Sequence, residues 1–187
     1  MIIVITLPTF IDGEADKIVS LFEQRHIDYL HLRKPDASAA DVERLLQEIP
    51  KKYYPRITVH DFHALAFKYQ LGGIHLTGRH PDVPEGWEGR VSTSCHCIYE
   101  LARRKQEGYL LNGGQKPFAY LSLSPIFDSI SKQGYHAAFS EKELEEAQRL
   151  GIIDQGVLAL GGVTFERLDE VRRMGFGGAM ILGDAWR

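Results

Sequence analysis

Short apolar runs alternate along the whole chain with stretches in which apolar residues recur every three or four positions. Runs rich in β-branched residues are typical of strands, and the second pattern is typical of helices with one buried face. The eight predicted strands are residues 2–7, 28–33, 56–60, 73–77, 90–94, 118–123, 157–161 and 178–182. Strands that alternate with helices are expected to be parallel, because parallel neighbours need a long crossover connection.

Polar residues at the starts of the helical stretches predict where some helices begin. Ser38 stands three residues before Asp41 and predicts an N-terminal cap, and Ser140 with Glu143 repeats this pattern. Thr164 is predicted to cap the last helix. The clearest buried helical face is formed by Val42, Leu45, Leu46 and Ile49.

Eight parallel strands fit closure into a barrel, so we predict one (β/α)8 TIM-barrel domain over residues 1–187, with a doubly wound open sheet as the alternative. The barrel is expected to be compact. Residues 78–89 are too few for a full helix after the fourth strand, and the sequence ends at Arg187, without a helix after the eighth. We therefore expect either a longer native chain or a partner subunit that covers the last strand, and we predict a homodimer.

Composition excludes several classes of function. The net charge of -3 does not favour nucleic acid, and no apolar run reaches the ~18 residues of a membrane span. The first ten residues lack the basic start and the cleavage site of a signal peptide, so we interpret them as a strand. Cys95 and Cys97 are interpreted as reduced thiols of a cytoplasmic protein.

Polar residues collect where the predicted strands end, which is where TIM barrels carry their sites. Any single histidine there is equally well explained as a structural residue, but together they indicate a site for a polar ligand. Gly161, Gly162 and Gly183 let the main chain approach a ligand after the last two strands, which is typical of a phosphate site. The other polar candidates are His31, Arg33, Lys34, His60, Asp61, His75, His80, Ser94, His96 and the segment 129–134 with Lys132.

Motifs in the same order as in a known family extend over nearly the whole chain. They are HLRKP at 31–35, VHDFHALAFKYQLGGIHL at 59–76, SCHCIYE at 94–100, SPIFDSISK at 124–132, LALGGV at 158–163 and GFGGAMILGDAW at 175–186. These segments resemble thiamine-phosphate synthase and its relative, thiazole tautomerase. The synthase joins hydroxymethylpyrimidine diphosphate to thiazole phosphate and releases pyrophosphate, so the resemblance implies a transferase of thiamine biosynthesis that acts on small phosphorylated substrates.

The resemblance also implies roles for individual residues. Asp61 would ligate Mg²⁺, and the position of a second metal ligand is occupied by His80. Catalytic roles fall on Arg33 and Lys132, and His31 and His96 at the strand ends are further catalytic candidates because they could act as acid or base. The pyrimidine diphosphate would contact His31, Arg33, Lys34, His60, Ser94 and Lys132. The thiazole phosphate would contact Ser129, Ser131, Gly161, Gly162, Leu182 and Gly183.

The chain departs from both templates, which keeps alternatives open. His80 stands where the synthase has a carboxylate, and magnesium prefers oxygen ligands. The tautomerase needs proton transfer and no metal, but Pro125 stands where it carries a histidine; His31, His96 or His136 could then be the acid or base. A non-catalytic phosphate binder is a further alternative. A metallohydrolase would need paired histidines on the first strand, which has none.

Overall fold

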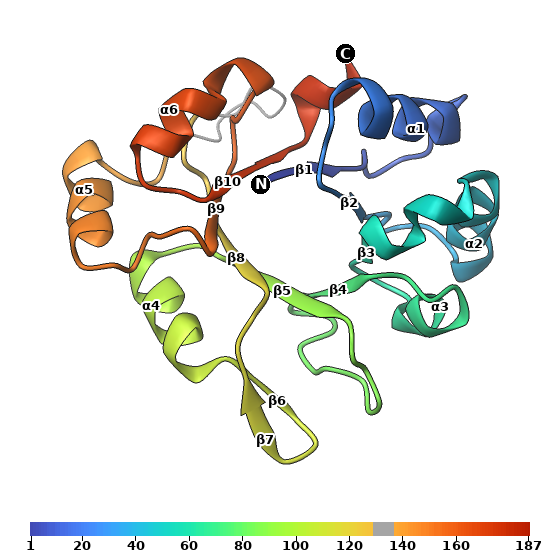
Figure 1. Ribbon diagram of the computed structural model, residues 1–187, viewed down its shortest axis with the longest axis horizontal. Helices are drawn as coiled ribbons and strands as arrows, with labels where there is room; N and C mark the ends of the chain where they lie inside the picture. The colour runs from blue at the N-terminus through green and yellow to red at the C-terminus, as the bar shows by residue number, and fades with distance from the viewer. Residues whose placement is uncertain (129–136) are drawn as a thin grey trace.

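The computed structural model describes residues 1–128 and 137–187, and it confirms the predicted barrel. Eight parallel strands close in the order β1-β10-β9-β8-β5-β4-β3-β2 (Figure 1). Closure excludes the open-sheet alternative. The barrel strands are β1 (Ile2–Ile5), β2 (Tyr29–Leu32), β3 (Ile57–Val59), β4 (Gly73–Leu76), β5 (Arg90–Cys95), β8 (Tyr120–Leu123), β9 (Val157–Leu160) and β10 (Gly178–Ile181).

Helices form an outer ring around the barrel (Figure 1). The α-helices are α1 (Glu14–Gln24), α2 (Ala39–Glu48), α3 (His63–Lys68), α4 (Ile98–Glu107), α5 (Glu141–Arg149) and α6 (Leu168–Arg173). The described residues also form the 3-10 helices η1 (Lys51–Arg56), η2 (Phe165–Arg167) and η3 (Gly183–Trp186). Among the described residues no helix is long and apolar enough to cross a membrane.

Two of the predicted caps are confirmed and one is wrong. Ser38 accepts a hydrogen bond from the Asp41 N–H at 3.2 Å, and Ser140 forms a reciprocal capping box with Glu143. The Thr164 side chain makes no such bond. The N–H of Phe165 instead donates to the Asp184 carboxylate at 3.0 Å, so a residue beyond β10 satisfies the start of η2.

As predicted, the described residues contain no full helix between β4 and β5 or after β10. A loop with the buried Trp87 joins β4 to β5, and only η3 follows β10, where the Trp186 indole donates to the Ile5 carbonyl at 2.7 Å. A feature the sequence did not predict is the hairpin of β6 (Tyr109–Leu111) and β7 (Gly114–Lys116), which projects from the barrel (Figure 1). The homodimer and the cytoplasmic location stay predictions.

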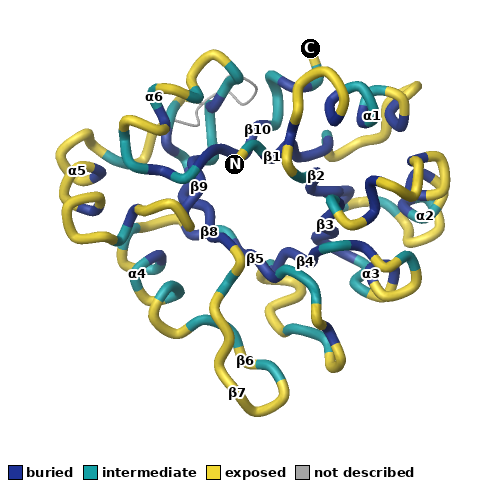
Figure 2. Tube along the Cα trace, in the orientation of Figure 1, coloured by how far each residue is buried: buried dark blue, intermediate teal, exposed yellow. Residues whose placement is uncertain are grey.

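The inside of the barrel is apolar on one side and polar on the other. Most residues of the barrel strands are buried, while the outer helix faces and the β6–β7 hairpin are largely exposed (Figure 2). Ile3, Ile5, Leu158 and Met180 form an interior cluster with the Tyr120 ring, distinct from the larger core between strands and helices. The buried polar interior is supplied by β2 to β5 and β8, with His31, Thr58, His75, Ser92 and Ser122 among its members.

Candidate functional site

A cavity of about 560 Å³ opens at the C-terminal ends of the strands, where the sequence predicted the site. Residues that follow β2, β3, β5, β9 and β10 meet there, because parallel strands in a closed barrel all end on one face. The predicted site residues that line it are Arg33, His60, Ser94, His96, Gly161, Gly162, Leu182 and Gly183. His75, noted at sequence level but given no role there, lines it as well.

Two guanidinium groups make part of the cavity wall cationic. Arg33 follows β2, and Arg104 reaches the cavity from α4. Neither forms an ion pair with a described residue, and the Arg104 Nε is buried without a hydrogen-bond partner among them. Arg104 was missed at sequence level, because nothing in the sequence shows which face of α4 meets the strand ends. Unpaired guanidinium groups beside a cavity suit a phosphate ligand.

The glycine pair after β9 forms another part of the wall. Gly161 and Gly162 have left-handed φ values of +92° and +65°, and a Cβ on Gly162 would lie 2.3 Å from the Asp128 carbonyl oxygen. The pair therefore lets the segment after β8 lie against the strand end, with the Phe127 N–H bonded to the Gly161 carbonyl at 3.0 Å. No described residue accepts a hydrogen bond from the N–H of Gly162 or Gly183, which leaves these donors for an anion.

His96 is the exposed imidazole of the cavity wall. Its Nδ1 lies 3.2 Å from the Ser124 hydroxyl, and its backbone N–H donates to the Glu100 carboxylate at 2.9 Å. Both partners also line the cavity. The arrangement fixes the start of α4 and presents a group that can accept or donate a proton to a bound ligand.

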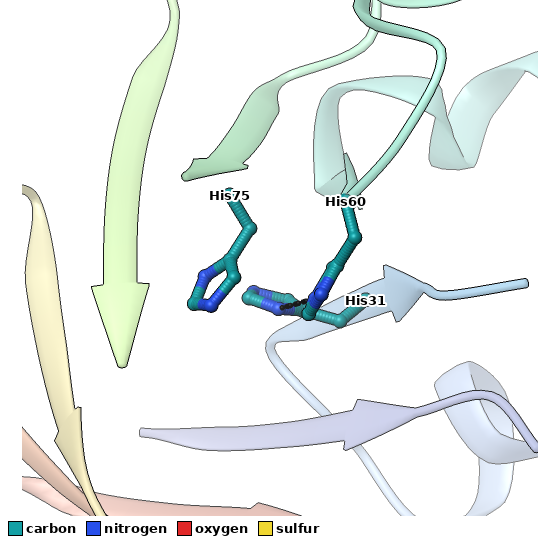
Figure 3. A group of neighbouring side chains, drawn as sticks. All are labelled: His31, His60 and His75. Atoms are coloured by element: carbon teal, nitrogen blue, oxygen red, sulfur yellow. Dashed lines mark hydrogen bonds between the residues drawn. The ribbon is translucent and has the colours of Figure 1, made fainter. Parts of the chain in front are cut away.

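Three histidines from adjacent strands form the polar floor of the cavity (Figure 3). The Nδ1 of His31 lies 2.9 Å from the Nε2 of His60, and the other His31 nitrogen lies 2.6 Å from the Tyr120 hydroxyl. The two ring nitrogens of His75 contact the hydroxyls of Ser92 and Ser94 at 2.8 and 3.1 Å. His60 and His75 line the cavity, whereas His31 lies beneath them and is buried completely.

Burial controls the charge of this floor. Desolvation lowers the pKa of His31 and of His60 well below the ordinary value of 6.5, and the neighbouring His75 adds to both shifts. Desolvation, with charge repulsion from His63 and Arg33, lowers the pKa of His75 to about 3. The three imidazoles are therefore neutral at neutral pH.

Lys34 does not lie at the cavity, although the sequence placed it with the pyrimidine diphosphate. Its ammonium is buried and bonded to both Glu14 carboxylate oxygens at 2.7 and 2.8 Å and to the Thr9 carbonyl at 2.8 Å. The alternation along β2 explains the difference, because His31 and Arg33 point inward and Lys34, one residue on, points outward to α1. The same alternation was visible in the sequence.

Asp61 and its neighbours do not fit the predicted magnesium. Its Oδ1 accepts from the Arg79 guanidinium at 2.9 Å and lies 3.4 Å from the His80 imidazole. Its Oδ2 is buried and has no hydrogen-bond partner among the described residues. Magnesium prefers several oxygen ligands, whereas this group offers one carboxylate that is already paired with a cation. The magnesium prediction therefore stays a prediction without support from this donor set.

Three predicted contacts and one candidate base lie outside the described residues. Ser129, Ser131 and Lys132, expected at the two phosphates, belong to this segment, and so does His136. Their roles stay predictions.

A closed (β/α)8 barrel whose strand ends carry a cavity, with two guanidinium groups and two backbone N–H groups that bond to no described residue, is typical of barrels that bind phosphorylated ligands. The profile of the family described as "Thiamine monophosphate synthase" matches residues 2–183. The chain therefore belongs to the thiamine monophosphate synthase family, a family of transferases.

Individual relatives agree with this assignment. A thiamine-phosphate synthase of Photorhabdus laumondii is 26% identical over 179 residues, which cover 88% of this chain and 75% of the relative. A crystal structure of thiamine phosphate pyrophosphorylase from Bacteroides thetaiotaomicron is 42% identical, with a TM-score of 0.83 over 99% of this chain and 84% of that one. A Pyrococcus furiosus structure of the same name, 16% identical with a TM-score of 0.67 over 97% of this chain and 84% of that one, supports the fold alone.

Proposed function

We propose that this chain couples hydroxymethylpyrimidine diphosphate to thiazole phosphate and releases pyrophosphate. The observation that carries the proposal is a cavity lined by two guanidinium groups that pair with no described residue and, after β9 and β10, by backbone N–H groups that bond to none. Two such regions suit a reaction that brings two phosphorylated molecules together. The names of the relatives are consistent with this reaction.

Charge development explains what the guanidinium groups do. In the reaction the bond between the pyrimidinylmethyl carbon and the diphosphate oxygen breaks, and the pyrophosphate leaves with the electron pair. The thiazole nitrogen then forms a bond to that carbon. Arg33 and Arg104 stabilise the negative charge on the leaving group, in a pocket where water competes weakly. The Ser94 hydroxyl, held by His75 and Ser122, is placed to orient the diphosphate half.

The thiazole phosphate is assigned to the glycine side. The N–H groups of Gly162 and Gly183 can donate to its phosphate oxygens, and the apolar Ile5, Leu160 and Met180 lie along the same cavity as a surface for the ring. This placement directs the thiazole nitrogen toward the guanidinium side. These roles belong to side chains and backbone groups alone, because the residues around Asp61 do not fit a magnesium ion.

A matched pair of arginines on α4 tests the proposal. Arg104 lines the cavity, whereas the adjacent Arg103 pairs with Glu107 on the surface. With both substrates and Mg²⁺ supplied, Arg104→Gln is expected to lower kcat/KM for thiamine phosphate formation by about 10- to 100-fold, the value of a lost charge-assisted hydrogen bond. Arg103→Gln is expected to retain the wild-type value. Equal rates for the two variants, or no product from the wild type, would contradict the proposal.

Thiazole tautomerisation is the second candidate, and a specific contact favours it. The carboxylate expected to hold the metal is paired with Arg79, while His96 stands in the cavity against Ser124 and could move a proton without a metal. The assay is isomerisation of the thiazole carboxylate phosphate in the presence of a chelator. Turnover that disappears in His96→Asn, together with no coupling activity, would replace the first proposal with this one. Binding of thiazole phosphate without either turnover would indicate a non-catalytic binder.

A further inference from the structure

The three histidines of the cavity floor come from three neighbouring strands. His31 lies on β2, His60 follows β3 and His75 lies on β4, and the strands pair β2 to β3 to β4. In Figure 3 the three imidazoles point toward one another from these strands. One ring nitrogen from each lies within 4.8 Å of the others, and this is the one such group of three among the described residues searched.

Each imidazole has the chemical form that a transition metal requires. A histidine ligand must be neutral, with a free lone pair on the nitrogen that faces the ion. All three side chains are buried, and burial lowers the pKa of each, as described above. No described carboxylate is within hydrogen-bond distance of the three rings, so the group is a set of nitrogen donors.

Hydroxyl groups hold the outward-facing nitrogens of two of the rings. Tyr120 contacts His31 Nε2 at 2.6 Å and Ser92 contacts His75 Nδ1 at 2.8 Å. The nitrogens that remain for an ion are therefore His31 Nδ1 and His75 Nε2, and His60 Nε2 already faces His31. Metal-binding histidines commonly have the second nitrogen fixed by a hydrogen bond of this kind.

The distances require only small movements. Two ligands at ~2.05 Å from a tetrahedral zinc ion lie about 3.3 Å apart. The His31–His60 nitrogen pair, now 2.9 Å apart, would separate slightly. The proton between these two nitrogens would move to the other nitrogen of the ring that carries it, so both rings stay neutral and both facing lone pairs are free for the ion. His75 would turn its Nε2 away from the Ser94 hydroxyl, 3.1 Å away, and toward the other two rings.

We propose that His31, His60 and His75 form a binding site for one divalent transition-metal ion of the zinc type, with its fourth position open to the cavity. Imidazole suits zinc, copper, iron and nickel, whereas magnesium prefers oxygen. His60, His75 and Ser94 line the cavity, so the open position faces bound ligand or water. Three protein ligands with one open position are typical of catalytic rather than structural zinc. This site shares the cavity with the proposed coupling reaction, but it does not include Asp61, and no step of that reaction depends on it.

Cobalt provides the test, because its visible absorption reports both stoichiometry and coordination. Chain freed of metal with a chelator is titrated with Co²⁺ and then with Zn²⁺. We expect one Co²⁺ per chain, with the intense bands of four or five coordination, displaced by one equivalent of Zn²⁺. X-ray absorption of the zinc-loaded wild type is expected to show three imidazole ligands. Absence of stoichiometric binding, or fewer than three imidazoles, would overturn the proposal, even if no variant folded.

Variants then assign the ligands. His31→Gln and His75→Gln are each expected to weaken Co²⁺ binding at least 10-fold, and Tyr120→Phe, which removes the hydroxyl on His31, about 10-fold. His26→Asn, a change in an exposed histidine with a φ of +49°, and Asp61→Asn should leave binding unchanged. Binding retained in His75→Gln, or lost in His26→Asn, would refute the assignment. The coupling assay is a separate measurement, so failure of either proposal is visible without the other.

Discussion

The stability of the barrel is expected to fall steeply in mild acid, because the buried histidines must be protonated there. His31, His60 and His75 have pKa values in the folded protein below the 6.5 expected of an unfolded chain. In this range the unfolded state binds more protons than the folded state, so stability rises with pH. Stability is therefore independent of these histidines above about pH 7.5, and it falls progressively as the pH drops below about 6.5 toward their lowered pKa values.

The magnitude follows from proton linkage. Between about pH 7.5 and pH 5.5, a histidine that stays neutral when folded costs about 1.4 kcal/mol of unfolding free energy. Three such residues together cost about 4 kcal/mol, which is a large part of the ~5–15 kcal/mol that stabilises a typical domain. Carboxylates contribute little in this window, because their pKa values in an unfolded chain lie near 4.

Urea unfolding at these two pH values, followed by tryptophan fluorescence with a chelator present to exclude metal binding, measures the effect. Replacement of one member, His75→Gln, should reduce the pH-dependent loss by about a third, whatever it does to absolute stability. A wild-type loss of about 1 kcal/mol or less would refute the reasoning, since it would mean that the floor is hydrated or already charged.

Three further results are expected. Lys34→Met should destabilise the fold by about 3–5 kcal/mol, measured by urea unfolding, because it leaves the Glu14 carboxylate buried and unpaired, and adding Glu14→Gln should restore part of the loss. If Lys34→Met instead left stability unchanged and abolished coupling, the sequence-based role of Lys34 in substrate binding would be right. Gly162→Ala should lower Tm and raise KM for thiazole phosphate, because its Cβ would lie 2.3 Å from the Asp128 carbonyl oxygen. The control is Gly151→Ala, where no atom lies within 4 Å of the new Cβ. It should cost only backbone strain and leave KM unchanged. Phe127→Leu is expected to leave KM within a few-fold of wild type, since the contact with Gly161 is made by its backbone N–H; a large rise would assign the ring a direct role.

The alternation of apolar runs and helical periodicity was sufficient for the architecture. Parallel strands joined by helices all point the same way, so their C-terminal ends lie on one face of the barrel. The sequence alone therefore assigned one site to Arg33, Ser94, His96 and the glycine pair. The lack of a full helix between β4 and β5 was equally visible, since the number of residues between two strands and their proline content are local properties.

Contacts between elements distant in the sequence could be decided only by the tertiary structure. Arg104 reaches the cavity because of the way α4 packs on the barrel. Asp61 is paired with Arg79 because the residues that follow the neighbouring strands β3 and β4 meet at the same end of the barrel. The three histidines become one group through strand register and barrel curvature, which set the distance between side chains on different strands. Sequence periodicity gives the face on which a side chain lies, but the partner that it meets there depends on packing across the whole barrel.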